Sequence, residues 1–193
     1  MHFLKTIIPL LVLSSLIGMS SLHAQSYEKP SNLLKRSQLK GNIDILGANI
    51  SYEKRIGNGL TAYFDGGLTY GFIINGGLLY EGKQVGYELA PIVSASLRKY
   101  YNLIKRMNKG RNIKNNAANF ISLKVGYRFT PIASKYMYAS SVFAVEPSWG
   151  IQRNIGKHFS FEVAPGYAFL YAPQDNNYGG TVTLKLRIGY IIF

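Results

Sequence analysis

Hydrophobic and polar residues alternate with a period of two along much of the chain. In residues 159–171 the odd positions hold apolar or aromatic side chains such as Phe159, Phe161 and Phe169. Serine, glutamate, alanine and glycine occupy the even positions from 160 to 168. Successive side chains of a β-strand point to opposite faces, so this alternation predicts a strand with one apolar face and one face of small and polar residues.

Six other segments show the same alternation, so the sequence predicts seven strands. They span residues 48–56, 60–72, 85–97, 119–129, 143–151, 159–171 and 181–192. Strands of soluble proteins average about five or six residues, whereas a tilted strand that crosses a membrane needs about nine to eleven. The lengths of the predicted strands therefore favour membrane-spanning strands.

A change of phase predicts an eighth strand. Apolar residues occupy odd positions before Leu46 and even positions after Gly47. A shift of one residue turns every side chain to the opposite face, so a tight turn or a bulge is expected there. A turn makes residues 38–45 the first strand and gives an even number of strands, as in single-chain bacterial barrels. The alternative is a first strand further upstream, within residues 27–38.

The polar faces of these strands carry acidic and basic residues in similar number. Those assigned to a common interior are Glu53, Asp65, Glu88, Lys124, Arg128, Glu146, Glu162, Lys185 and Arg187, with Arg55 on the same face. In an outer-membrane barrel the apolar face contacts lipid and such charges pair inside. The chain also has 15 tyrosines, a residue that bands the two membrane interfaces of barrels. We therefore predict an all-β fold, a closed antiparallel up-and-down transmembrane β-barrel of about eight strands.

The interior of such a barrel is narrow, because eight strands enclose a space that side chains just fill. An unpaired buried charge is costly, so the interior charges are expected to pair and to form a plug rather than a channel. The functional alternative is a narrow ion path, or a proton-sensitive gate, through the same residues.

The first 24 residues have the features of a secretory signal peptide. Lys5 gives a short positive region, an apolar stretch runs from Ile7 to Ile17, and Ala24 occupies a small-residue cleavage position. The alternative is an uncleaved membrane anchor, for which the apolar run is short. The chain is thus divided into a cleaved signal peptide (1–24), an N-terminal periplasmic segment (25–38) and a barrel domain (39–193).

The connections between strands are assigned by counting back from a periplasmic C-terminus. Residues 73–84, 130–140 and 172–180 become outer loops, whereas residues 57–59, 103–118 and 156–158 become periplasmic turns. Both very short turns fall on the periplasmic side, where the turns of outer-membrane barrels are short.

Several segments, in this order, resemble small eight-stranded outer-membrane barrels of the OmpA/OmpX-like class, in the form found in uncharacterised Bacteroidetes-type proteins. They are SLHAQ, SYEKRIG, KVGYRF, RKYYNLIKRMNKGRNIKNN, WGIQRNIGKHFSFE and the aromatic C-terminus GYIIF. The resemblance spans most of residues 40–193. It implies that Tyr190 and Phe193 belong to the signal read by the outer-membrane insertion machinery, although Phe193 is out of phase with Tyr190.

Composition narrows the choice of partners. The chain has no cysteine, which excludes disulfides and thiolate metal sites. Lys5 is the only charged residue before Gln25, so the chain from Gln25 onward carries a formal charge of +12. Strong positive charge suggests a polyanion as partner. Nucleic acid is a poor candidate for an exported protein, so acidic lipid headgroups and cell-wall polymers are better candidates. We expect a monomer that contacts outer-membrane lipid and lipopolysaccharide and needs no cofactor.

Basic residues gather in the segment from Arg98 to Lys114. The turn itself holds Lys105, Arg106, Lys109, Arg111 and Lys114, with Arg98 and Lys99 just before it. One interpretation is a solvated turn whose bases anchor near headgroups, and the other is a site for an anionic polymer or partner. Tyr100 and Tyr101 are assigned to the interfacial girdle.

Catalytic candidates are few. His158, Ser160 and Glu162 are expected on one strand face, and a Ser/His/acid set can activate a nucleophile. A single histidine after the signal peptide cannot supply a metal site. The predicted function is therefore a non-enzymatic structural or surface-interaction role in the outer membrane of a Gram-negative bacterium. The alternatives are a barrel-embedded lipid A-modifying hydrolase that uses Ser160 and His158, and a small ion channel.

Overall fold

Nine antiparallel strands make up most of the part of the chain that the computed structural model describes, residues 33–75, 84–137 and 140–193. They are β1 (Ser37–Asp44), β2 (Gly47–Gly57), β3 (Leu60–Asn75), β4 (Gln84–Tyr100), β5 (Asn119–Arg128), β6 (Ala133–Lys135), β7 (Val142–Ile155), β8 (Phe159–Ala172) and β9 (Asn177–Ile191). The predicted signal peptide, the upstream candidate for a first strand as far as residue 32, and most of the expected loop 73–84 lie outside the described residues.

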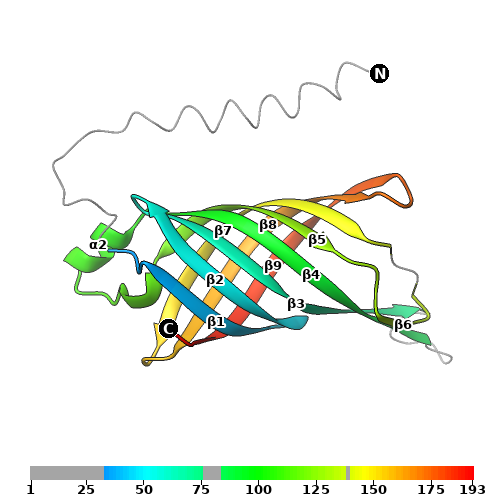
Figure 1. Cartoon of the computed structure of the whole chain (residues 1–193), viewed down its shortest axis with the longest axis horizontal. Coiled ribbons are helices and arrows are strands. Elements are labelled where there is room, and N and C mark those ends of the chain that lie inside the picture. The colour runs from blue at the N-terminus through cyan, green and yellow to red at the C-terminus, as the bar shows by residue number, and fades with distance from the viewer. Residues whose placement is uncertain (1–32, 76–83, 138–139) are drawn as a thin grey trace, which may run out of the picture.

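The eight long strands form a closed ring of hydrogen-bonded pairs. Each pairs antiparallel with its neighbours in the order β1, β2, β3, β4, β5, β7, β8, β9. The ring closes because β1 pairs with β9 as well as with β2, with Lys40 opposite Ile191. Figure 1 shows these strands tilted around a common axis. The prediction of an all-β, antiparallel, up-and-down and barrel-like sheet is confirmed.

The predicted strands lie where the alternation placed them, with shifts at their ends. The change of phase near Leu46 is a two-residue turn, because β1 ends at Asp44 and β2 begins at Gly47. Strand β4 continues three residues past the expected end at Leu97. Strand β9 begins at Asn177, so the connection expected over 172–180 is a turn of residues 173–176.

The two ends of the ring differ. One end, here called the cap end, carries the turn at 58–59, the turn at 156–158, the C-terminus and the helices α2 (Leu103–Asn108) and η2 (Lys114–Asn116) (Figure 1). The opposite end, here called the loop end, carries the turn at 45–46, the turn at 173–176 and the short strand β6.

Two connections that were expected to be irregular have regular structure. The segment 103–118 was expected to be a basic turn, but Leu103 and Ala118 are buried with Tyr100 and Phe120 in an apolar cluster that holds the helices against the ring. The expected outer loop 130–140 contains β6, which pairs with β4 from Ala133 opposite Leu89 to Lys135 opposite Tyr87.

Apolar side chains cover the outside of the ring. Every long strand contributes at least one large apolar side chain that is more than a third exposed, for example Ile43, Ile50, Phe64, Val93, Leu123, Trp149, Phe169 and Leu184. The inward side is mostly polar, and the buried apolar cluster lies at the cap end. Among the described residues, no helix is long and apolar enough to cross a membrane.

Candidate functional site

Charged side chains fill the inside of the ring, with six acids and six bases among the described residues. This set, here called the interior network, comprises Lys40, Asp44, Glu53, Asp65, Glu88, Arg98, Lys124, Arg128, Glu146, Glu162, Lys185 and Arg187. Alternation places them there, since each lies on the strand face opposite to the exposed apolar residues. The interior network therefore carries no net formal charge.

The ion pair between Arg98 of β4 and Glu162 of β8 joins opposite walls of the ring. Arg98 Nη1 and Nη2 donate to Glu162 Oε2 and Oε1 at 2.9 and 3.2 Å, a bidentate arrangement. The guanidinium also lies over the rings of Tyr63 at 3.5 Å and Phe120 at 4.6 Å. Lys185 Nζ is the next cation, 3.8 Å from Glu162 Oε1. Arg98 is only 1% exposed, so it depends on these partners.

Glu53 is held by neutral donors. It accepts hydrogen bonds from Thr61 Oγ1 at 2.6 Å, from the Tyr100 hydroxyl at 2.8 Å and from Gln38 Nε2. Each of these side chains is buried, so the carboxylate is desolvated and hydrogen-bonded at once.

Lys40 connects the interior network to the cap. Its Nζ donates to Gln152 Oε1 at 3.0 Å, and Gln152 Nε2 donates to the backbone oxygens of Asn115 and Asn116. The η2 segment is thus tied to β1 and β7 through one buried glutamine.

Arg187 of β9 lies opposite Glu162 of the neighbouring strand β8 and bridges β9 to β1 and β3. It makes a bidentate contact with Asp44, through Nε to Oδ1 at 2.6 Å and Nη2 to Oδ2 at 2.8 Å. It also donates to the Tyr63 hydroxyl, and its Nη1 lies 3.4 Å from Asp65 Oδ2. Tyr63 therefore contacts both Arg98 and Arg187 and joins the two parts of the network.

Two further ion pairs link adjacent strands. Lys124 Nζ lies 2.7 Å from Glu146 Oε2. Arg128 pairs with Glu88 and also donates to the backbone oxygen of Ser140 at 3.1 Å. The basic side chains of these pairs are about a fifth exposed, so they lie in a wetter environment than Arg98.

Several members of this network were not predicted from the sequence. All nine residues assigned to the interior lie on the inward face, and Arg55 lies near the cap end, donating to the backbone oxygen of Leu34. Arg98 was grouped with the basic segment from Arg98 to Lys114, and the structure places it inside because β4 extends to Tyr100. Tyr100 was assigned to the girdle and is buried, whereas Tyr101 is exposed. Lys40 and Asp44 were not predicted, although both share the even phase of β1.

The catalytic candidates are not brought together. His158 is exposed in the turn before β8, and its ring stacks on Tyr190 with centroids 5.8 Å apart. Ser160 donates to the backbone oxygen of Gly189 at 3.4 Å, and Glu162 is bound to Arg98. The expectation of one shared face is wrong for His158, because the strand begins only at Phe159. Within the described ranges, no group of three His, Cys, Asp or Glu side chains could hold a metal ion.

The predicted terminal signal residues lie at the cap end. Tyr190 and Phe193 are each about half exposed, and Ile191 between them is buried. The backbone oxygen of Phe193 accepts a hydrogen bond from the Leu39 amide at 3.1 Å, which fixes the end of the chain against β1.

The cap end holds a basic cavity of about 430 Å³. Five cationic side chains line it, namely Lys105, Arg106, Lys109, Arg111 and Arg153. Arg106 is largely buried, and this burial, together with Arg111 nearby, lowers its pKa from the ordinary value. Lys114, assigned by sequence to the same basic turn, does not line the cavity. Its backbone oxygen accepts a hydrogen bond from Asn154 Nδ2.

Comparison with known proteins identifies no relative. No protein-family model matches the chain. Neither a curated protein nor a solved structure matches it either.

Proposed function

We propose that this chain is a bacterial outer-membrane protein, a closed eight-stranded barrel of the OmpA/OmpX-like class that is inserted after removal of a signal peptide. The observation that carries the proposal is the inverted distribution of side chains, with an apolar belt on all eight long strands around a charge-balanced interior. Soluble monomers rarely expose continuous apolar patches of more than a few hundred Å². A hydrocarbon environment removes this penalty and favours the alternation of apolar-out and polar-in positions.

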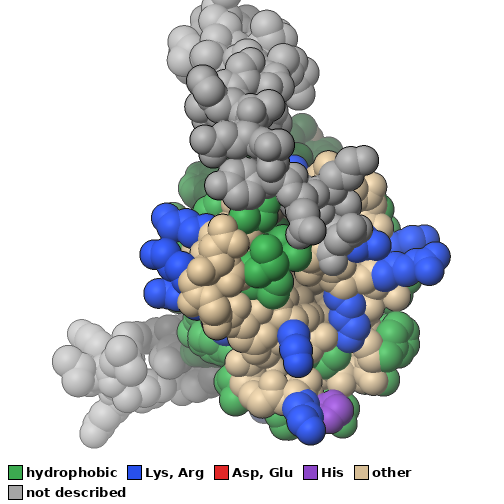
Figure 2. Space-filling model, turned by 90° about the vertical axis from the view of Figure 1, so that its left-hand side faces the viewer, with side chains coloured by type: hydrophobic (Ala, Val, Ile, Leu, Met, Phe, Trp, Pro, Cys, Tyr) green, Lys and Arg blue, Asp and Glu red, His purple; other side chains and the backbone are tan. Residues whose placement is uncertain are grey.

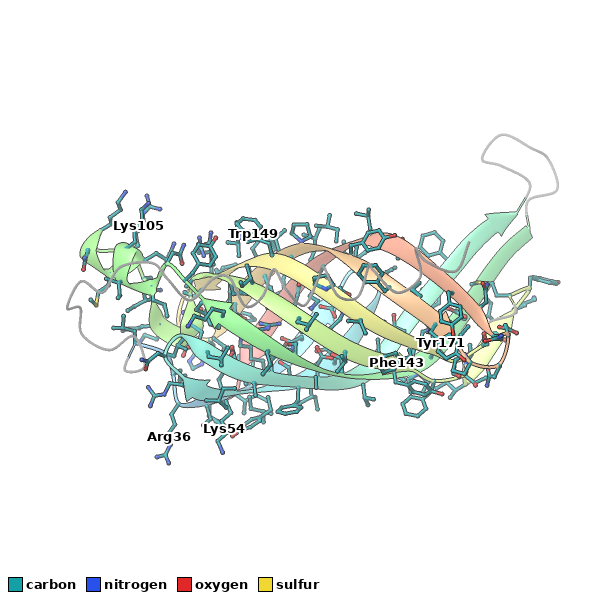
Figure 3. The ribbon with its side chains drawn as sticks, turned by 90° about the horizontal axis from the view of Figure 1, so that it is seen from above. Arg36, Lys54, Lys105, Phe143, Trp149 and Tyr171 are labelled. Atoms are coloured by element: carbon teal, nitrogen blue, oxygen red, sulfur yellow. The ribbon has the colours of Figure 1, made fainter. Side chains whose placement is uncertain are left out.

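Aromatic contacts near the two ends of the ring support this proposal. Trp149 Nε1 donates to the Tyr101 hydroxyl at 2.7 Å on the outer surface towards the cap end. Tyr171 and Tyr178 stack with centroids 4.6 Å apart near the loop end. Figure 3 shows Trp149 and Tyr171 well separated along the axis. Aromatic pairs near both ends of the ring are typical of the amphipathic girdles at the two membrane–water interfaces.

The proposed role is structural, or one of surface interaction through the loop end, without catalysis. Ion-paired and hydrogen-bonded charges fill the interior, which disfavours conduction, and Ser160 and His158 do not form a nucleophile–base pair. In this account the cap end is periplasmic, lipopolysaccharide contacts the outer part of the belt, and the protein is a monomer. The insertion machinery would read the terminal segment with Tyr190 and Phe193.

Heat-modifiability tests this proposal. The mature protein, folded in detergent, is compared on a gel with and without boiling, and its circular dichroism is recorded. A shift in mobility together with a β-type spectrum is expected for a closed barrel. Absence of a shift, in a protein that stays soluble without detergent, would indicate instead that the apolar faces pack against one another in a secreted β-sandwich.

A further inference from the structure

The excess positive charge of the protein lies outside the interior network. Since the network holds equal numbers of acids and bases, the formal net charge of +13 belongs to the rest of the chain. Figure 2 views the cap end and shows Lys and Arg side chains spread around it, with no Asp or Glu side chain in view among the described residues. A binding partner at this end is therefore expected to be anionic.

The basic cavity at the cap end combines cations that are held by hydrogen bonds with cations that are exposed. Arg153 is held by hydrogen bonds from Nη2 to Asn119 Oδ1 and from Nη1 to the Gln152 backbone oxygen, both at 2.7 Å. Arg106 is held by a bond from Nη2 to the Asn112 backbone oxygen at 2.9 Å, and its buried Nε has no partner among the described residues.

The remaining cations of the cavity are exposed. Lys105, Lys109 and Arg111 form no ion pair within the described ranges. Two positioned guanidinium groups and three exposed cations, with no acid among the described lining residues, favour a group with several anionic oxygens.

The position of the cavity restricts the kind of anion. Tyr101 lines the cavity, and its hydroxyl accepts the hydrogen bond from Trp149. Asn119, another lining residue, begins β5, whose exposed apolar side chains Ile121, Leu123 and Val125 continue away from the cavity. The cavity thus lies beside an aromatic pair of the kind found at the level of the lipid headgroups. It also lies next to the first residue of a strand whose apolar side chains are exposed.

We propose that this cavity binds the phosphate of an anionic glycerophospholipid in the leaflet at the cap end, with the acyl chains lying along β5. The inference rests on the proposed membrane location. Arg153 and Arg106 provide the fixed contacts, and the exposed cations complete the charge. A basic pocket beside a membrane-spanning segment attracts anionic headgroups in this way.

Native mass spectrometry of the detergent-folded mature protein tests this site. Phosphatidylglycerol, phosphatidylcholine and inorganic phosphate are added separately at equal concentration. The test variant is the triple substitution Lys105→Gln, Lys109→Gln and Arg111→Gln, which touches only exposed side chains. The control variant is Arg36→Gln, Lys54→Gln and Lys157→Gln, which removes the same charge at the same end. Figure 3 shows Arg36 and Lys54 well apart from Lys105.

The wild type and the control are expected to retain phosphatidylglycerol over phosphatidylcholine, and the test variant to retain it at least about tenfold more weakly. Equal loss in both variants, or no preference in the wild type, would overturn the lipid site. Inorganic phosphate binding without lipid retention would also overturn it and would indicate a soluble anion or polymer as the ligand. A gel of the same samples separates the two proposals, because a heat-modifiable barrel that retains no phosphatidylglycerol refutes only this inference.

Discussion

Replacing Glu162 by Gln should destabilise the folded protein more than any other single charge removal in the interior network. The substitution keeps the shape of the side chain but leaves Arg98 without its carboxylate. Arg98 is 1% exposed and cannot turn to water. Glu53 cannot replace the lost charge directly, because it is engaged by Gln38, Thr61 and Tyr100.

The expected cost is about 3–5 kcal/mol of unfolding free energy, the usual penalty when one partner of a buried ion pair is removed. Glu146→Gln is the matched comparison. Its partner Lys124 has a side chain that is 18% exposed and can reach water, so the cost should be closer to about 1 kcal/mol. The double variant Arg98→Met with Glu162→Gln removes both charges, and its cost should fall below the sum of the single costs by at least about 1 kcal/mol.

Urea unfolding of protein folded into lipid vesicles measures these costs. The chain has one tryptophan, and Trp149 lies on the outer surface, so its emission reports insertion without interference from other tryptophans. A cost below about 1 kcal/mol for Glu162→Gln would mean that Arg98 does not need the Glu162 carboxylate. So would strict additivity of the Arg98 and Glu162 substitutions, because it would mean that the two side chains do not depend on each other.

Three further predictions follow from packing, pairing and charge. A Cβ at Gly150 would lie 2.2 Å from Phe120 Cζ, so Gly150→Ala should lower the free energy of unfolding by about 1–3 kcal/mol in the same assay. Gly41→Ala is the control: its Cβ would meet no described atom within 4 Å, so it should change the free energy of unfolding by less than about 0.5 kcal/mol. Because β1 pairs with β9 only as far as Arg187, the even-numbered amides from 178 to 186 have no strand partner among the described residues. By hydrogen-exchange NMR they should exchange much faster than the odd-numbered amides bonded to β8, and equal protection would contradict the pairing. The reconstituted protein should be electrically silent in planar bilayers because its interior charges are ion-paired or hydrogen-bonded to one another and to neutral side chains, and steady single-channel conductance would contradict a plugged interior.

The strand pattern was largely predictable because alternation is a local property of the sequence. Each strand exposes one face and buries the other, so the period of two can be detected in the sequence of a single strand, even when its neighbouring strands are unknown. The turn near Leu46 was equally predictable from the change of phase, since a turn or a bulge is needed to move the apolar side chains from odd to even positions. These two signals were sufficient to predict eight long strands and their antiparallel order.

The parts that were missed depend on contacts between distant residues. Arg98 was grouped with the bases that follow Leu97, and the structure pairs it instead with Glu162, 64 residues later in the chain. Extending the even phase of Ser94 and Ser96 would have placed both Arg98 and Tyr100 in the interior. Helix α2 has six residues and β6 has three, too few for either period to be detected.

The environment of the side chains of β8 in a bilayer tests most directly whether the protein is a membrane barrel. The chain lacks cysteine, so single cysteines for spin labels can be placed at Phe161 and Phe169 on the apolar face and at Ala164 and Ala168 on the buried face. Labels at Phe161 and Phe169 are expected to collide with oxygen dissolved in lipid and to be shielded from a water-soluble relaxation agent. Labels at Ala164 and Ala168 are expected to be shielded from both. If the labels at Phe161 and Phe169 met the water-soluble agent, or all four were equally buried, the apolar face would not be facing lipid and the membrane barrel would be contradicted.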